Sequence, residues 1–288
     1  MDAELRRLER AGIRQTNGAA IKLRADVLRA WLRDGDAKAL RAPIAAFERD
    51  LKRTLADAMA AGYLQGRLRA RATARAARNK GLSLAKTLDD SMDDFADRLG
   101  IGPRDVQRLA NYFTEQATAR VVDAGSLIRS KLADAVADAI KSGDSVRTAA
   151  AAIREAMNAS GLTNQNPYLA QTLYRTSLQE SYAAAKWQAN QEPEVQEMLW
   201  GYEYVATLDD RTTDLCIDLD GTRRKKGDAF CDRYTPPNHY NCRSQIIEVF
   251  NVDEIAIATR VPKVELPGEG FQVNFGKLFE TPGAVLVA

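Results

Sequence analysis

The chain has 288 residues, of which 45% are hydrophobic and 28% are charged. This length and composition can bury one large or two ordinary cores, so we expect a globular protein. We find no run of about 18 apolar residues and no apolar stretch behind a basic start, so we expect neither a transmembrane helix nor a secretory signal, and a cytosolic location. Three cysteines are too few for a disulfide scaffold and favour reduced thiols, a metal site or simple burial.

The net charge of +2 conceals an uneven distribution along the chain. Residues 1–80 carry 19 Lys or Arg and 9 Asp or Glu, a balance of +10, and the remainder has a balance of −8. Two interpretations stay open: the basic part contacts an acidic partner such as nucleic acid, or its arginines only solvate amphipathic helices. The densest basic run, from Arg67 to Lys80, contains no aromatic residue that stacks on bases, which favours the second interpretation for that run.

Apolar residues recur every three or four positions from Leu5 to about Met157, which predicts amphipathic helices. The clearest stripes are Phe47, Leu51, Leu55 and Met59, then Val106, Leu109, Phe113 and Ala117, and then Leu127, Leu132, Val136 and Ile140. Glycine and proline predict where these helices end, which gives about five or six of them. The predicted breaks are Gly35-Asp36, Ala42-Pro43, Gly62, Gly81, Gly100 to Pro103 and Gly143-Asp144. Pro103 suits the first turn of a new helix, and Ser145 suits an N-cap.

The pattern changes in the C-terminal third of the chain. Tyr168 to about Asn190 predicts one long helix, and the alternating Trp200, Tyr202 and Tyr204 predict a strand with one aromatic face. Residues 246–250 suggest a second strand, and a tail rich in Gly and Pro beyond Pro262 is expected to be extended.

These patterns together predict a mainly α protein. An elongated helical N-terminal and middle region is followed by a small, loop-rich α+β C-terminal domain. The expected divisions are a basic amphipathic helical region at 1–100, a domain with a helical hairpin, the long helix and a Cys/His motif at 101–250, and an extended tail at 251–288.

All three cysteines and the only histidine lie between Asp209 and Arg243. Thiolates and imidazole nitrogens are the usual ligands of structural zinc, which takes four in a tetrahedron. The spacing matches only in part, because 14 residues separate the first two cysteines whereas the histidine and the last cysteine form a close pair. The candidate zinc ligands are Cys216, Cys231, His239 and Cys242. In the alternative interpretation the cysteines are small buried hydrophobes and the histidine is a hydrogen-bonded loop residue.

Two further kinds of chemistry are possible in the same segment. A cysteine thiolate activated by His239 is a candidate nucleophile, but the spacing does not select one of the three cysteines, nor one of the orienting carboxylates Asp209, Asp210 and Asp214. The acidic residues around Asp218 superficially resemble a calcium loop. The spacing of an EF-hand is not met, and Asp220-Gly221 by itself predicts a turn.

The loops also carry residues suited to holding two segments together. Arg211 and Arg243 lie in or beside acidic loops, and bidentate pairs with carboxylates would lock these loops. Pro236-Pro237 rigidifies the approach to His239. Such a network would hold a small domain in shape without any catalysis.

Four motifs occur here in a particular order. They are Arg-Thr in the long helix, Asp-x-Arg-Thr at 209–212, Cys-x-x-Leu-Asp-Gly at 216–221 and Pro-Pro-x-His-x-x-Cys-Arg at 236–243. In this order they resemble the phage head morphogenesis family, the minor head proteins similar to protein F of bacteriophage Mu, over about residues 120–250. The residues that carry the resemblance, beside the cysteines and the histidine, are Arg175, Thr176, Asp209, Arg211, Thr212, Asp220, Gly221, Pro237 and Arg243.

The resemblance implies a structural minor head protein of a tailed phage, present in few copies near the portal and assisting head assembly or genome delivery. The implied partners are the portal protein and the major coat or scaffolding protein, with packaged DNA for the basic N-terminal region and no membrane. The implied location is the head interior or portal vertex, after assembly in the host cytoplasm. The alternative is an enzyme or toxin-like effector that uses His239 and the cysteines.

This chain departs from the family pattern at two positions. Members of the family commonly have Cys-x-x-Cys before Leu-Asp-Gly and Cys-Arg-Cys after the histidine, but here Thr213 and Ser244 occupy the positions of two cysteines. The resemblance therefore does not by itself imply zinc, although Cys231 can substitute for one missing ligand. Without zinc, hydrogen bonds from Arg211, Thr212, Asp220 and Arg243 would hold the loop.

Overall fold

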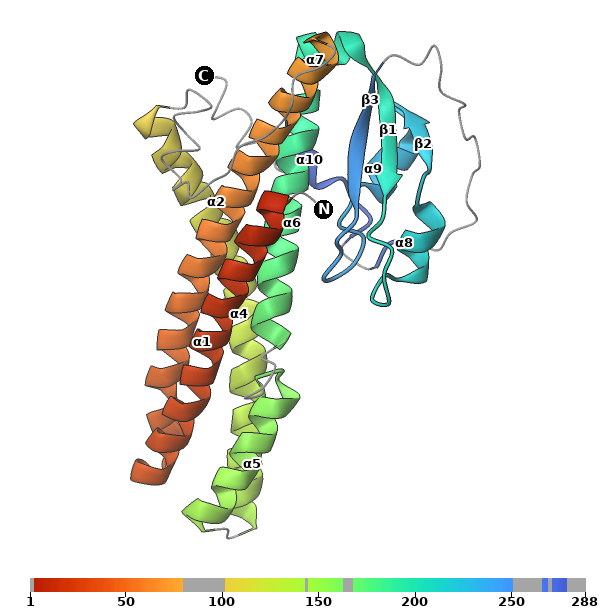
Figure 1. Cartoon of the computed structure of the whole chain (residues 1–288). Coiled ribbons are helices and arrows are strands. Elements are labelled where there is room, and N and C mark those ends of the chain that lie inside the picture. Colours follow the sequence, from red (N-terminus) through yellow and green to blue (C-terminus); the bar gives the residue numbers. More distant parts are fainter. Residues whose placement is uncertain are drawn as a thin grey trace. The chain divides into compact units, whose positions relative to one another are not determined.

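The computed structural model describes residues 3–79, 102–142, 145–162, 168–250, 266–268 and 271–278. Its long helices and small sheet are drawn in Figure 1. The chain divides into two compact units, which we describe separately: unit 1 comprises residues 1–8, 58–111 and 175–288, and unit 2 comprises residues 9–57 and 112–174. Among the described helices, none is both long enough and apolar enough to cross a lipid bilayer.

Unit 2 is a helical bundle. Its residues belong to α1 (Ala3–Asp34), the 3-10 helix η1 (Ala37–Leu40), α2 (Arg41–Asn79), α4 (Pro103–Lys141), α5 (Val146–Ala159) and the first turns of α6 (Tyr168–Asn190). The apolar stripes predicted from the sequence form its core: Phe47, Leu51 and Leu55 of α2 and Phe113 of α4 are almost completely buried. Leu127, which we placed in a stripe, is instead 42% exposed, and its neighbour Ile128 is buried.

Polar contacts join α1 to both ends of α5 within unit 2. The indole N–H of Trp31 donates to the carbonyl of Val146 at 2.9 Å. Near the other end of α5, the Arg24 guanidinium donates to the Asn158 side chain at 2.6 Å and to the Leu162 carbonyl at 3.1 Å. These bonds fix the alignment of the two helices, because each buried donor has its acceptor in only one position.

The helix ends test the predicted breaks. The break at Gly35, the start of α4 at Pro103 and the Ser145 cap of α5 are confirmed, and the Ser145 Oγ accepts the N–H of Thr148 at 3.1 Å. The break predicted at Ala42-Pro43 lies within two residues of the boundary between η1 and α2 at Arg41, whereas the break predicted at Gly62 is wrong, because α2 continues through it. Pro43 lies in the first turn of α2, where backbone N–H groups have no partner within the helix. Gly81, Gly100 and Gly143-Asp144 lie outside the described residues.

Gly62 belongs to unit 1 and has a packing role rather than a terminating one. A Cβ at this position would lie 2.8 Å from the carbonyl oxygen of Leu178 in α6. Gly66 is similar, since its Cβ would lie 2.4 Å from the carbonyl oxygen of Tyr182. The two glycines therefore allow α2 and α6 to approach closely in this unit.

A three-stranded antiparallel sheet forms the α/β part of unit 1. Its order is β2-β1-β3, with β1 (Leu199–Val205) in the centre, β2 (Arg223–Lys225) on one edge and β3 (Gln245–Phe250) on the other. The two strands predicted from the sequence, β1 and β3, are confirmed. The third, β2, is too short to give a pattern of alternation.

Helix α6, predicted as one long helix, is confirmed and packs against this sheet. Trp187 stacks on Tyr202 of β1, with ring centroids 5.3 Å apart. The Lys186 ammonium donates to the carbonyl of Ile246 at 2.9 Å and lies 3.2 Å from a carboxylate oxygen of Glu248, and both charged side chains are buried. This paired charge and the stacked rings hold α6 and the sheet in one arrangement, which positions the loops described below.

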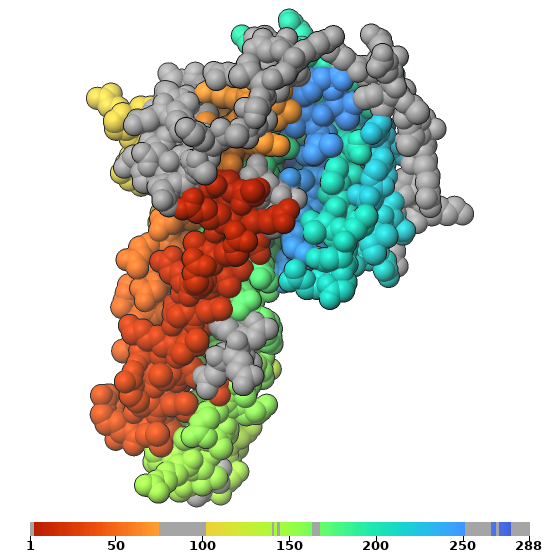
Figure 2. All heavy atoms as spheres, in the orientation of Figure 1, coloured from red at the N-terminus to blue at the C-terminus, as the bar shows by residue number. Residues whose placement is uncertain are grey.

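Among the described residues of unit 1 there are also four short helices: α7 (Pro193–Met198), α8 (Asp214–Leu219), α9 (Ala229–Tyr234) and α10 (Phe275–Leu278). Figure 2 shows the heavy atoms of residues 199–250, in teal to blue, as one continuous packed body. Helix α10 lies in the segment expected to be extended, and the neighbouring Phe271 and Phe275 are buried. Residues 251–265, 269–270 and 279–288 lie outside the described part, so the extended tail stays a prediction there.

The expected fold class is confirmed, since the chain is mainly α with a small α+β region near its C-terminus. The domain boundaries expected at residues 100 and 250 stay a prediction.

Candidate functional site

Two cysteines and the histidine meet at one point of unit 1. Cys216 lies on α8, and His239 and Cys242 lie in the loop between α9 and β3. The Cys216 Sγ is 3.2 Å from the His239 Nε2 and 3.9 Å from the Cys242 Sγ, and the three donor atoms all lie within 4.8 Å of one another. Both cysteines are buried and the histidine is half-buried.

The structure places Cys231 apart from these three. It lies on α9, and its Sγ is 3.8 Å from the carbonyl oxygen of Lys225. Burial, helped by the nearby Asp228 and Asp232, raises the pKa of Cys231 to about 12, which keeps it a thiol at neutral pH. Of the four candidate ligands, the structure therefore brings together only three.

Neighbouring groups orient the histidine and one cysteine. The His239 Nδ1 lies 2.8 Å from the carbonyl oxygen of Tyr240, to which it donates when Nδ1 carries the proton. That tautomer leaves the Nε2 lone pair directed toward Cys216 and toward the Thr213 hydroxyl, which lies 3.0 Å away. The Tyr204 hydroxyl of β1 donates to the Cys216 Sγ at 3.2 Å and accepts from the Asn238 amide at 3.0 Å.

The protonation of the cluster follows from these contacts. Hydrogen bonds from the Cys242 thiol and from the Nε2 of a protonated His239 lower the pKa of Cys216 well below that of a free thiol. The pKa of Cys242 is raised by the adjacent Cys216 and by burial, and the pKa of His239 is raised by its hydrogen bond with Cys216. Negative charge in this cluster therefore resides on Cys216.

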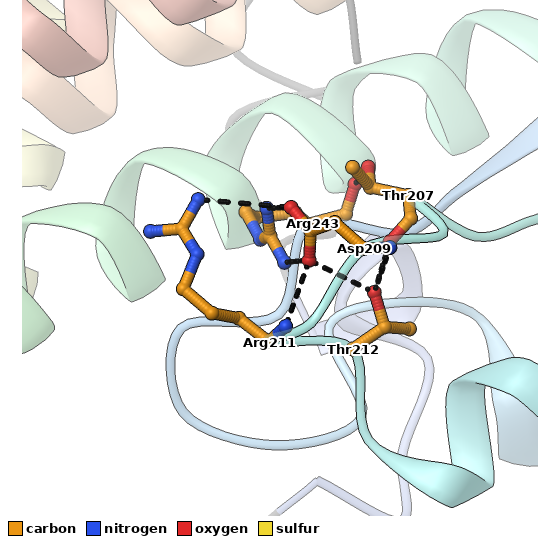
Figure 3. Close-up of polar contacts among 5 residues, drawn as sticks. All are labelled: Thr207, Asp209, Arg211, Thr212 and Arg243. Atoms are coloured by element: carbon orange, nitrogen blue, oxygen red, sulfur yellow. Dashed lines mark hydrogen bonds and ion pairs between the residues drawn. The ribbon is translucent and has the colours of Figure 1, made fainter.

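A second group of residues fastens the loop that carries Thr213 (Figure 3). The Asp209 carboxylate accepts two hydrogen bonds from the Arg243 guanidinium, each at 2.6 Å, and a third from the backbone N–H of Arg211 at 3.0 Å. The Thr212 hydroxyl accepts the N–H of Asp209 at 3.1 Å and donates to the carbonyl of Thr207. Arg243 and the Arg211 N–H hold the pKa of Asp209 well below its usual range. The bidentate pair expected from the sequence is thus present at Asp209 and Arg243, and we call these two residues the loop clamp.

The other motif residues support the same loops. The Asp220 carboxylate accepts the N–H of Ala206 at 2.7 Å, and Gly221 makes the expected turn with φ +71°. The Thr176 hydroxyl of α6 accepts the N–H of Asn241 at 3.2 Å. Pro237 is buried ahead of the histidine, and Arg175 is half-buried on α6.

Sequence reasoning missed three side chains that position the site. Tyr204 was expected only as an aromatic strand residue, yet its hydroxyl contacts Cys216. Asn238 is buried and donates to that hydroxyl, and the Gln179 amide of α6 donates to the carbonyl of Ser244 at 2.8 Å. None of these belongs to a recognisable motif, although polar residues with buried positions on a helix or strand are a general sign of such roles.

A small cavity opens beside the cluster. Its volume of about 10 Å³ suffices for one water molecule and is far below that of a substrate pocket. Its lining is polar and includes Thr207, Arg211, Thr213, Cys216, His239 and Arg243.

The three donor atoms fit a zinc ion. Two thiolates bound tetrahedrally at about 2.3 Å from zinc lie about 3.8 Å apart, close to the 3.9 Å between the sulfurs of Cys216 and Cys242. The contact of the His239 Nδ1 with a carbonyl is the outer-shell partner that zinc-binding histidines usually have. These three residues can therefore hold a metal, which would cross-link α8 to the loop before β3.

Residues 130–247 match the model of the family described as phage Mu protein F like protein. This segment is similar to that family. The resemblance to the phage head morphogenesis family is thus confirmed over a segment that lies within the expected 120–250. No curated protein and no solved structure shows significant similarity to the chain.

The segment that matches the Mu F-like family contains the whole candidate site. It includes Cys216, His239, Cys242 and the loop clamp, together with α5, α6 and most of the sheet. The site is therefore a feature of the matched segment itself rather than of the flanking segments.

Proposed function

We propose that this protein is a minor head protein of a tailed bacteriophage, which assists head assembly or genome delivery near the portal. The observation that carries this proposal is the match of residues 130–247 to the phage Mu protein F like family. In this role the Cys216, His239 and Cys242 cluster and the loop clamp stabilise the domain and so preserve the surfaces that meet other head proteins.

The geometry of the site supports a structural role. The Cys216 side chain is 1% exposed, and the adjacent cavity holds about one water molecule. The hydrogen bonds of the loop clamp join residues 34 positions apart in the sequence, as a cross-link between loops does. Such contacts fix a surface in one conformation, which is what a protein that binds others in an assembly requires.

We propose the portal protein and the major coat or scaffolding protein as partners, with packaged DNA for the basic N-terminal region. Along α1 the side chains of Arg10, Arg14 and Lys22 are exposed, and within the described residues they form no ion pair. Uncompensated cations on an exposed helix face attract phosphates without sequence preference.

The experiment that tests the proposal is chemical cross-linking of intact phage heads followed by mass spectrometry. We expect this chain inside the particle at low copy number, with cross-links to portal or coat peptides. Its absence from purified heads, when it is abundant in the infected cell, would contradict the proposal.

The DNA contact has a separate test within the same role. The binding of DNA to the purified chain should weaken steeply with salt, and replacing Arg10, Arg14 and Lys22 by Gln should lower the slope of log K against log salt by up to about 3. The control is Arg33→Gln, since Arg33 is already paired with Asp34. Binding that does not depend on salt would point to a protein partner instead.

The distance of 3.2 Å between the Cys216 Sγ and the His239 Nε2 also favours the alternative, an enzyme or toxin-like effector with a thiolate nucleophile. Burial of Cys216 and contact of the histidine Nδ1 with a carbonyl rather than a carboxylate weigh against it. For the structural role we expect His239→Ala to reduce stability or head assembly. A turnover that is abolished by His239→Ala while the fold stays intact would favour the enzyme.

A further inference from the structure

The cluster offers a metal three side-chain ligands, not four. The donor atoms of Cys216, His239 and Cys242 converge, whereas the Sγ of Cys231 is outside this group and lies 3.8 Å from the carbonyl oxygen of Lys225. Among the described residues, no further Cys, His, Asp or Glu joins the three. A metal bound here in tetrahedral geometry would therefore lack one protein ligand.

The Thr213 hydroxyl lies beside the cluster, next to the histidine nitrogen. It is 3.0 Å from the His239 Nε2, and Thr213 lines the small cavity together with Cys216 and His239. A neutral hydroxyl is not among the usual zinc ligands, which are thiolate, imidazole and carboxylate. The cavity beside it has room for one water-sized ligand.

The charges around the cavity suit a small neutral or anionic ligand. Arg211 and Arg243 both line it, and Asp209 is their shared carboxylate partner, which leaves a local balance of one positive charge. A divalent ion with two thiolates and a neutral imidazole adds no net charge. Water or hydroxide is therefore compatible with the site, whereas a further cation is not.

We infer that Cys216, His239 and Cys242 form an open three-ligand zinc site, in which a water-sized ligand that is not part of the protein takes the fourth position beside Thr213. This inference goes beyond the role in head assembly and does not depend on it. The open site differs from a closed four-ligand site, in which Cys231 would be the fourth ligand. An open position makes the ion accessible to exchange, as in zinc sites that keep a bound water.

X-ray absorption at the zinc edge, on the purified full chain loaded with zinc, tests the inference by counting sulfur neighbours. We expect about one zinc per chain with two sulfur and two nitrogen or oxygen neighbours. Cys231→Ser should leave this pattern unchanged. Three sulfur neighbours in the unaltered chain, a sulfur lost on Cys231→Ser, or a folded chain that takes up no zinc would each overturn the inference.

Two substitutions at Thr213 locate the open position. Thr213→Cys should raise the count from two sulfurs to three, because it supplies a thiolate beside the His239 Nε2. Thr213→Val should keep four neighbours, since water supplies the fourth. Loss of one neighbour in Thr213→Val would show that the hydroxyl itself is the ligand. An unchanged sulfur count in a folded Thr213→Cys chain would place the open position elsewhere. Either result would overturn the assignment. If Thr213→Cys fails to fold, the sulfur counts of the unaltered chain and of Cys231→Ser still distinguish an open site from a closed one.

Discussion

In unit 2, long helices bury stripes of Leu, Ile, Phe and Ala. In residues 199–250 of unit 1, by contrast, short elements are joined by loops, and these loops are held by charged and polar contacts such as the loop clamp. The helical unit obtains its stability from apolar area and periodicity. The α/β part obtains its shape from a few contacts between residues that are distant in the sequence, so single polar substitutions should affect it more.

The largest effect is expected in the core of unit 2. Phe113 is completely buried, so Phe113→Ala should lower the free energy of unfolding by about 3–5 kcal/mol through lost burial and a cavity. Val122, on the same helix but 53% exposed, provides the control, and Val122→Ala should change stability by less than about 0.5 kcal/mol. Chemical denaturation measures both. Equal effects would show that the apolar stripes do not carry the stability of this unit.

Two glycines, one in each unit, allow the effect of helix propensity on stability to be distinguished from the effect of packing. Gly66→Ala in unit 1 should destabilise by about 1–3 kcal/mol, because the new methyl group would collide with the carbonyl of Tyr182. Gly18→Ala in unit 2 meets no atom within 4 Å and should stabilise by about 0.5–1 kcal/mol. Thermal unfolding compares the two variants. Stabilisation by both would mean that α2 and α6 are not in close contact at Gly66.

The smallest effect concerns the loop clamp and depends on pH. Arg243 lowers the pKa of Asp209 in the folded chain. The ionised carboxylate therefore stabilises the fold at pH values above the pKa of about 3.9 that Asp has in the unfolded chain. This stabilisation is lost as the pH falls through the lower pKa of Asp209 in the folded chain. The difference in Tm between the unaltered chain and Asp209→Asn should therefore be constant from about pH 5 to 7 and shrink below about pH 4. A difference that persists unchanged at pH 2.5 would contradict this role for the charge.

The sequence predicted the helical part better than the site, for physical reasons. A stripe such as Phe47, Leu51 and Leu55 records which helix face is buried, and this information is local. The failure at Gly62 arises because a glycine at a close helix contact looks the same in sequence as a glycine that ends a helix. Its role depends on neighbours that the local pattern does not contain.

At the site, the sequence identified the residue types and the segment, but not which of the cysteines lie next to the histidine. Spacing marked His239 and Cys242 as a pair, and the loop clamp was expected from charge alone. Whether Cys216 or Cys231 completes the cluster depends on how α8 and α9 pack, and two cysteines with 14 residues between them carry no signal that distinguishes them. Tyr204 was missed because a strand pattern shows which side chains are buried but not what their hydroxyls contact.

The most direct test of the difference between the two regions is hydrogen exchange followed by mass spectrometry, on the zinc-loaded full chain before and after chelation. We predict that chelation raises exchange in peptides covering residues 207–244, which contain the cluster and the loop clamp, and leaves residues 112–159 of unit 2 unchanged. The same protection with and without zinc, or an equal rise in both regions, would contradict the view that the Cys216, His239 and Cys242 cluster holds the α/β part in shape.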